Sequence, residues 1–291
     1  MRALFALKSG EGLPSIGPML SQTRPHPVSR PRRSAWGVMR DVLFALFLRE
    51  LKTRLDGRWT TALWVIGEPL AGALLMLALY TLMRTREIAG VDTVLFLLSG
   101  QLSFMLLRSL VLRLMESIDA NLGLFAYRQV RPVDAVLARA GVELAIFGGM
   151  ALLILPGAAW AGHGLLPHDP LGLLLALLLL TLLGLAGGLL AAVGTHGALA
   201  LLRPVLKMAF MPLYLGSGAI VPLAHLPQGL REWLLLSPLP HLIESIRIAL
   251  FGPVYAAPQG IGLTLPLVWT GLATLLALAL LQLRGDRLQV A

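Results

Sequence analysis

The run Leu173-Leu-Leu-Ala-Leu-Leu-Leu-Leu180 decides the fold class, because it places eight apolar residues in succession without a polar alternate. It belongs to a longer apolar stretch near 171–195. A helix needs roughly 20 apolar residues to cross a bilayer, since every backbone N–H and C=O must then be paired inside the segment. A strand of a membrane barrel would instead alternate apolar and polar residues. The run therefore predicts a transmembrane helix.

Five further stretches have the same character, and the composition of the whole chain agrees with them. Apolar residues make up 57% of the 291 residues and charged residues 13%, against about 25% in soluble domains. We therefore predict an all-α integral membrane protein with six transmembrane helices, near 62–83, 93–113, 135–161, 171–195, 204–224 and 262–283.

The basic residues predict the orientation of these helices, because Lys and Arg are retained on the cytoplasmic side. With six spans, one side holds only Arg84, Arg86, Arg231 and Arg247, and all other Lys and Arg fall on the side of the two termini or at membrane depth. We expect a multi-pass membrane protein with both termini in the cytoplasm; that the membrane is a bacterial inner (cytoplasmic) membrane is implied by the resemblance described below. The net charge of +9 then favours anionic membrane lipids as contacts, and we predict no nucleic-acid partner.

Two segments precede the first span. Residues 1–35 are rich in Pro and Arg and predict a flexible basic cytoplasmic tail. In residues 36–58, apolar residues recur at helical spacing and basic residues crowd the end, which predicts an interfacial amphipathic helix. The remaining residues, 59–291, form the predicted six-span domain. The basic residues at the end of the helix are either an ordinary topology anchor or a rim that receives the phosphate of a lipid-linked substrate: Arg49, Lys52, Arg54 and Arg58.

The segment 116–134, between the second and third spans, is the most hydrophilic interruption of the chain after the first span. Polar, basic and aromatic residues mix there with a glycine hinge and a terminal proline, so the segment must lie outside the hydrocarbon. Its apolar residues suit a helix-in-groove contact with another protein, with arginines at the rim. We predict a short helix that docks on a partner through Glu116, Asp119, Asn121, Leu122, Leu124, Phe125, Tyr127, Arg128 and Arg131.

The region 222–250 is apolar but contains four prolines and Gly229, which forbid one continuous span. We predict two short helices, near 228–236 and 240–250, forming a re-entrant hairpin on the outer side. A surface amphipathic loop is the alternative, because the second helix has polar residues on one face and apolar residues on the other. The polar residues assigned to this outer gate are His225, Arg231, Trp233, His241, Glu244 and Arg247.

The sequence offers little chemistry of its own. No lysine follows a glycine as a phosphate-binding P-loop requires, and there is no cysteine. We therefore predict no catalytic residue, no metal site and no cofactor in this chain. Ionisable residues at membrane depth either line a polar path or form buried ion pairs, and aromatic residues near them are further candidates for the lining of such a path. These path candidates are Trp59, Trp64, Glu68, Arg108, Glu143, Phe210 and Tyr214.

These polar blocks, taken in order, resemble the KpsM-type (ABC-2 family) permeases that export capsular polysaccharide in Gram-negative bacteria. The resemblance runs from about residue 44 to the end of the sixth span. The segment 119–134, followed by Ala138-Arg-Ala140, is its most specific part. The other blocks are Phe47–Arg54, Trp64 with Glu68-Pro69, Pro212–Tyr214, and Pro238–Glu244 with Arg247. Residues 1–35 have no family counterpart, and Ser237-Pro238 replaces the usual Asn-Pro.

The resemblance implies one subunit of an ATP-binding-cassette exporter that moves lipid-linked capsular polysaccharide from cytoplasm to periplasm. It implies a second copy of this chain, two ABC ATPase subunits that hold ATP and Mg, a periplasmic co-polymerase and an outer-membrane export protein. The segment 116–134 would then be the coupling helix. A permease for O-antigen or a teichoic-acid-like glycan is an alternative. A stand-alone secondary transporter is an alternative of another class, although it would call for broken helices in both halves of the chain.

Overall fold

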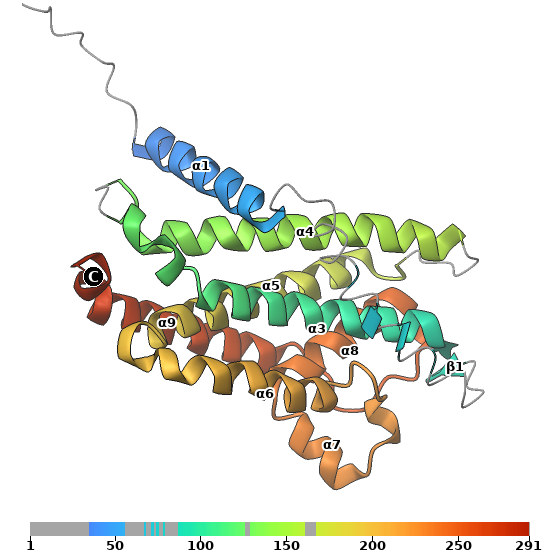
Figure 1. Cartoon of the computed structure of the whole chain (residues 1–291). Helices are drawn as coiled ribbons and strands as arrows, with labels where there is room; N and C mark the ends of the chain where they lie inside the picture. Colours follow the sequence, from blue (N-terminus) through green and yellow to red (C-terminus); the bar gives the residue numbers. More distant parts are fainter. Residues whose placement is uncertain are drawn as a thin grey trace, which may run out of the picture. The chain divides into compact units, whose positions relative to one another are not determined.

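A computed structural model of the chain describes residues 35–55, 67, 71–72, 74–75, 78, 87–125, 129–160 and 167–290. The chain divides into Met1–Ala35 and Trp36–Ala291, and the second unit holds nearly all of the described structure (Figure 1). The long helices are α1 (Ala35–Leu55), α3 (Thr93–Met115), α4 (Pro132–Trp160), α5 (Pro170–Gly194), α6 (Arg203–Gly216) and α9 (Thr264–Val290). The short elements are β1 (Glu87–Ile88), β2 (Val91–Asp92), η1 (Asp119–Leu124), η2 (Gly197–Leu202), η3 (Leu223–His225), α7 (Gln228–Leu234), α8 (Pro238–Phe251) and η4 (Gly252–Val254).

Five of the predicted spans have matching helices. Within the described residues, five helices are long and apolar enough to cross a membrane, or six if the bent pair α7–α8 counts as one span. The five cover Thr93–Met115, Pro132–Ile154, Pro170–Gly194, Leu199–Gly216 and Thr264–Arg284. Most of the first predicted span, 62–83, lies outside the described residues, as does the predicted tail before residue 35. A mostly helical protein with several apolar helices is therefore confirmed.

Helix α5 lies at the centre of the packing and contacts α3, α8 and α9. Small residues bring it close to α3. A methyl group added at Gly184 would lie 2.8 Å from Leu110, and one added at Gly188 would lie 2.8 Å from Leu114. Both leucines are fully buried. Small residues allow backbones to approach in membranes, where dispersion replaces the hydrophobic effect between helices. The pair α3–α5 is thus the tight core of the described structure.

Helix termini are fixed by side-chain caps. Asp92 accepts hydrogen bonds from the amides of Val94 at 2.8 Å and Leu95 at 3.4 Å, which satisfies two free donors at the start of α3. Asp169 caps α5 through the amide of Gly172 at 3.0 Å, and Pro170 occupies the first helical turn. Before α3, the two-residue strands β1 and β2 pair antiparallel across a turn in which Gly90 has φ of +83°. These caps mark where α3 and α5 begin.

Two short helices replace a continuous span between α6 and α9, as predicted. Helices α7 and α8 are bent by 100° relative to one another at the Ser237-Pro238 break. Helix α8 is not an amphipathic surface helix, because both of its faces are buried, whereas no residue of α7 is buried. The polar residues Glu244 and Arg247 of α8 are as completely enclosed as its apolar Leu242. The polar face of α8 therefore looks into the protein.

Helix α1 lies alongside α4 (Figure 1). The ring of Phe47 packs over Gly141, and Leu46 is buried. Trp36 and Phe44 remain exposed, which leaves apolar surface on this helix. Exposed apolar and exposed charged residues are mixed around α1 without one clear apolar face, and the position of this helix in a membrane interface stays a prediction.

Candidate functional site

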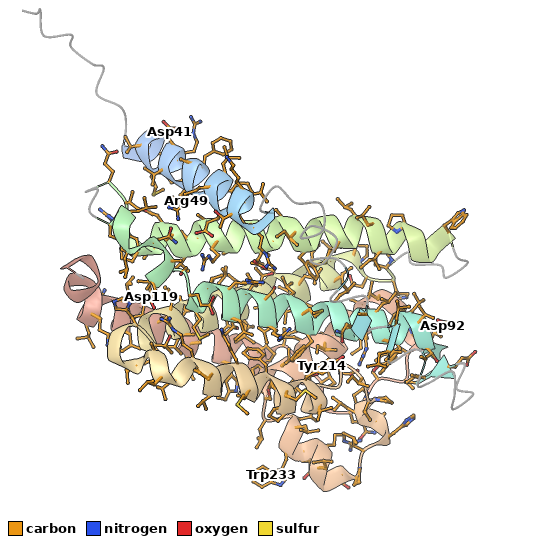
Figure 2. The ribbon with its side chains drawn as sticks, in the orientation of Figure 1. Asp41, Arg49, Asp92, Asp119, Tyr214 and Trp233 are labelled. Carbon is orange, nitrogen blue, oxygen red and sulfur yellow. The ribbon has the colours of Figure 1, made fainter. Side chains whose placement is uncertain are left out.

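The predicted docking segment contains the 3-10 helix η1, which connects α3 to α4 (Figure 2). Asn121 is its best-fixed residue and is 2% exposed. Its side-chain NH2 donates to the backbone oxygen of Ser117 at 2.7 Å and to Glu50 Oε1 at 3.2 Å. Its carbonyl oxygen accepts a hydrogen bond from the guanidinium of Arg49. One amide side chain thus ties η1 to helix α1.

Glu50 extends this contact to α4 and α3. Its carboxylate is 3.1 Å from the guanidinium of Arg139, which also donates to the backbone oxygen of Arg113 at 3.2 Å. Glu50 and its partner Arg139 are both largely buried. A buried carboxylate is stable only when paired and hydrogen-bonded, and this one is. Four elements, α1, α3, η1 and α4, therefore meet around one carboxylate and one amide.

Asp119 ties the same segment to the connection between α5 and α6. Its carboxylate contacts His196 Nδ1 at 2.5 Å and accepts from the guanidinium of Arg203. Arg203 also donates to the hydroxyl of Thr195 and to its backbone oxygen, each at 3.1 Å. The segment is therefore held on two sides, by α1 and by the first residue of α6.

A second ion pair lies one turn further along α6. Lys207 Nζ is 2.7 Å from Glu116 Oε1, and both side chains are about half exposed. The hydrogen bond from Lys207 holds the pKa of the Glu116 carboxyl below its usual range, against a smaller opposing effect of burial. Glu116 and Asp119, three residues apart, thus face Lys207 and Arg203, four residues apart. This double contact clasps α6 to the docking segment.

Two cavities run along the face of α3 that looks toward α4 and α6. The first has a volume of about 330 Å³, and its polar lining comes mainly from Arg54, Arg108, Arg113, Glu116, Glu143 and Lys207. The second, of about 250 Å³, is lined by Gln101, Phe104, Phe210 and Tyr214. Both share Met105, Arg108 and Lys207. A polar, partly aromatic space therefore extends from the middle of α3 to its end at Glu116.

Part of the predicted path thus comes together. Arg108, Glu143, Phe210 and Tyr214 all line one or both cavities. The ring of Tyr214 lies 4.6 Å from that of Phe104, and its hydroxyl donates to Gln101 Oε1. Trp59, Trp64 and Glu68 lie outside the described residues, as does Arg58 of the basic rim.

Of the two interpretations of Glu143, the ion pair is confirmed and the role in a translocation path stays a prediction. Glu143 lines the first cavity, and it is also an ion-pair partner, 3.5 Å from Arg54 and 4.0 Å from Arg113. Only 4% of its side chain is exposed. Since burying a lone carboxylate is costly, the two arginines offset part of the cost of enclosing Glu143 in the helix packing.

The predicted basic rim is not one free surface. Arg49 bonds to Asn121 and Arg54 pairs with Glu143, whereas Lys52 is exposed. The sequence alone suggests that Arg49 and Arg54 are both available to bind a phosphate. Their acidic and amide partners lie about 70 to 90 residues away in the chain, so the sequence alone does not reveal them.

The docking segment also differs from its expected form at Phe125. Its side chain is 7% exposed and belongs to the main apolar core, so it cannot serve as a surface anchor. Ala120, Gly123 and Gln129 are exposed instead, and Leu122 and Leu124 are half-buried. Arg131 is exposed, and its backbone N–H donates to Asp134. Tyr127 and Arg128 lie outside the described residues.

At the opposite end of α3, the residues of the predicted outer gate separate into two groups. His225 and Trp233 are exposed and Arg231 is half-buried. Glu244 and Arg247 are completely enclosed, 3.0 Å apart. His241 is buried and contacts the backbone oxygen of Leu235 at 2.8 Å.

Arg247 is the centre of the enclosed group. It donates to the backbone oxygens of Gly218 at 2.7 Å, Ala219 at 2.9 Å and Phe96 at 3.2 Å, and its guanidinium lies 3.6 Å from the centre of the Phe96 ring. The hydroxyl of Tyr255 donates to Glu244. Arg247 therefore joins α8 to the start of α3 and to the residues that follow α6, and it stabilises the packing of these three elements.

The sequence does not indicate that Arg203, Lys207 and His196 are partners of the docking segment. It also does not indicate Gln101 and Phe104 in the second cavity, or Tyr255 as the partner of Glu244. One signal was available for the first two. Acids spaced three apart and bases spaced four apart both match neighbouring positions on a helix face. That pattern indicates complementary faces but does not say that they meet.

Comparison with known proteins places this arrangement in a family. Residues 41–251 match the family of ABC-2 type transporters. The chain is 32% identical over 254 residues to the polysialic acid transport protein KpsM of Escherichia coli, which covers 87% of this chain and 97% of that protein. It is 30% identical over 217 residues to the capsule polysaccharide export inner-membrane protein CtrC of Neisseria meningitidis, covering 74% and 81%. It is 28% identical over 242 residues to the corresponding protein BexB of Haemophilus influenzae, covering 81% and 87%.

The family match contains α3, the clasped docking segment, α4, α5, α6 and the hairpin up to the end of α8, so it includes nearly every feature described above. The chain belongs to the ABC-2 type transporter family.

Proposed function

We propose that this chain is the permease subunit of an ATP-binding-cassette exporter that moves lipid-linked capsular polysaccharide from cytoplasm to periplasm. The observation that carries the proposal is the docking segment around η1, an exposed turn held by α1 and α6 in a chain similar to capsule export proteins. A segment that is partly exposed and is bonded to the neighbouring helices is what a permease needs to receive mechanical work from a separate motor.

The motor in this proposal is a pair of ABC ATPase subunits, which hold ATP and Mg and dock on η1 of two copies of this chain. The exposed positions Ala120, Gly123 and Gln129 form the contact face, with Arg131 at its rim. Leu122 and Leu124 contribute their half-exposed apolar surface. Movement of η1 reaches α1 through Asn121 and α6 through Asp119. This chain itself performs no catalysis.

The path in this proposal follows the joined cavities along α3, where Arg108, Phe210 and Tyr214 lie. Aromatic rings suit the faces of sugars, and cations suit a phosphate or an acidic sugar. The basic rim near the end of α1, in which Lys52 is exposed, receives the lipid-linked end of the substrate. The outer gate is the α7–α8 hairpin, which is re-entrant, with the mobile part at the exposed His225 and Trp233 and the fixed part at Arg247.

The assembly places both termini in the cytoplasm, with α1 as an interfacial helix and six spans in all. A periplasmic co-polymerase and an outer-membrane export protein continue the route beyond the inner membrane. The two rival functions, another glycan or a stand-alone secondary transporter, differ from this one in cargo and in the need for a motor.

The experiment that tests the motor contact uses two glycines in matched settings. Gly123 of η1 and Gly229 of α7 are both exposed, and a Cβ atom added at either meets nothing within 4 Å. Gly123→Glu therefore adds charge to the proposed docking face. We expect it to abolish co-purification of the ATPase and surface capsule, whereas Gly229→Glu, on the other side of the chain, keeps the ATPase bound.

An unchanged complex and normal capsule in Gly123→Glu would overturn the docking assignment. Transport by the purified chain alone in vesicles, without nucleotide, would establish the secondary transporter. If a strain that lacks this chain makes normal capsule but loses another surface glycan, that other glycan is the cargo.

A further inference from the structure

The joined cavities along α3 are more basic than acidic. Among the described residues that line them, Arg54, Arg108, Arg113 and Lys207 are cationic, and Glu116 and Glu143 are anionic. The excess is four minus two, or two positive charges. A partly enclosed space with that excess concentrates anions, because low-dielectric walls focus the field of the lining charges.

The two carboxylates in the lining differ in how firmly they are bound. Glu143 is 4% exposed and is flanked by Arg54 at 3.5 Å and Arg113 at 4.0 Å. Separating these charges would leave a buried carboxylate without a partner, so this cluster is fixed. Glu116 and Lys207 are 41% and 50% exposed. Ion pairs at such exposure are weak, because water screens the attraction and can replace either partner.

Lys207 is also well placed to change partner. It lines both cavities, while Glu116 lines only the first. Its side chain therefore lies where the aromatic part of the space, with Phe210 and Tyr214, meets the basic part. A ligand that carries both a sugar face and an anionic group fits this junction.

We infer that the joined cavities bind an anionic group of the transported molecule, a phosphate or a carboxylate, and that Lys207 leaves Glu116 to bind it. This inference rests on the proposed function and names the chemistry of its substrate. Arg108 is the second cation at the site. Phe210 and Tyr214 contact the adjoining sugar.

The exchange has a consequence at the docking segment. Glu116 follows the last residue of α3 and stands three residues before Asp119 of η1. When Lys207 turns to the ligand, one of the two contacts between α6 and this segment opens, while Asp119–Arg203 holds. Ligand binding thus weakens the attachment of α6 to the docking segment, on the side of the chain where the ATPase docks.

The test compares two variants that break the same ion pair from opposite sides. In Lys207→Gln the site loses a cation, so affinity for an anion falls. In Glu116→Gln the site loses the carboxylate that competes for Lys207, so affinity rises. We expect changes of about two- to fivefold in opposite directions, the size of one half-exposed ion pair. Lys207→Arg keeps the charge and the affinity.

Binding is measured on the full chain in phosphatidylcholine nanodiscs. The probes are dioctanoyl phosphatidylglycerol, which presents a lipid phosphate, and tetragalacturonate, which presents sugar carboxylates. Maltotetraose is the neutral comparison. Arg40→Gln is the matched control, because Arg40 is an exposed cation of α1 that lines neither cavity. The probe that follows the opposite-sign pattern identifies the source of the anion.

Three results would overturn the inference. The first is an equal effect of Lys207→Gln and Glu116→Gln on affinity, as a purely structural pair would give. The second is no binding of either anionic probe. The third is binding of maltotetraose as tight as that of the anions. Failure of the proposed function is seen separately, in Gly123→Glu with its ATPase and capsule readouts, which do not depend on ligand binding by the purified chain.

Discussion

The two polar clusters at opposite ends of α3 are built differently. Arg247 and Glu244 are wholly enclosed, and the two terminal nitrogens of Arg247 donate to three backbone oxygens. The cluster around η1 consists of several pairs that range from buried Glu50 to half-exposed Glu116. About 20 residues of helix, roughly 30 Å, separate them. The difference teaches that one end of α3 is fixed while the other is held by contacts that can be exchanged.

The largest effect is expected from Arg247→Ala. The change leaves three backbone oxygens enclosed without this donor and leaves the Glu244 carboxylate with the Tyr255 hydroxyl but no cation, which costs about 3–5 kcal/mol of the free energy of unfolding. Thermal unfolding in detergent measures it. Arg231→Ala, on the same hairpin but only half-buried, is the control and should change little. A loss below about 1 kcal/mol for Arg247→Ala would show that this end is no more fixed than the other.

Arg139→Ala comes next. Glu50 then lacks its main partner in a largely buried position, at a cost of about 1–3 kcal/mol. The same unfolding measurement applies, with Arg40→Ala as an exposed comparison on α1. If Glu50→Gln combined with Arg139→Ala were no more stable than Arg139→Ala alone, the loss would not come from a stranded carboxylate.

Asp119→Asn should reduce stability by only about 1 kcal/mol or less, because Asp119 is partly exposed. Its larger effect should be on coupling, since α6 loses its charged contact with η1. We expect the ATPase to remain bound and to hydrolyse ATP while export of capsule falls. The swap Asp119→Arg with Arg203→Asp should restore part of the export. Equal loss of binding and export in Asp119→Asn would indicate a defect in docking instead.

Glu116→Gln should have the smallest effect on stability. Because Lys207 lowers the pKa of Glu116 in the folded state, any contribution of this carboxylate is present above its ordinary pKa of 4.5 and is lost as the pH falls through the lower folded pKa. The difference in Tm between wild type and Glu116→Gln should be constant from about pH 8 to about pH 5 and vanish in more acid solution. A difference that grows with acidity would have the wrong sign for this pair.

The sequence predicts the spans well because apolar length alone determines them. The run around Leu173–Leu180 can only be satisfied as a helix in lipid, and the prolines after Val221 cannot continue one. Both features are local, so no tertiary information is needed. The position of the docking segment is predictable for the same reason.

The partners within the site are not predictable in this way. Asn121 meets Arg49 and Asp119 meets Arg203 across more than 70 residues, and no local rule chooses these pairs among the many charges at this end. Phe125 shows the same limit, because an aromatic residue in a polar segment suits an outward anchor and an inward one equally. In the structure the side chain of Phe125 points inward and is buried in the apolar core.

The glycines at 184 and 188 have a mechanical consequence. With no side chain between the backbone of α5 and the leucines of α3, the two helices interlock at van der Waals distance. Sliding one helix past the other would move Leu110 and Leu114 away from the glycines against which they pack, so we expect α3 and α5 to move together as one rigid body. A force on the turn after α3 would then pass sideways, to α1 through Asn121 and to α6 through Asp119.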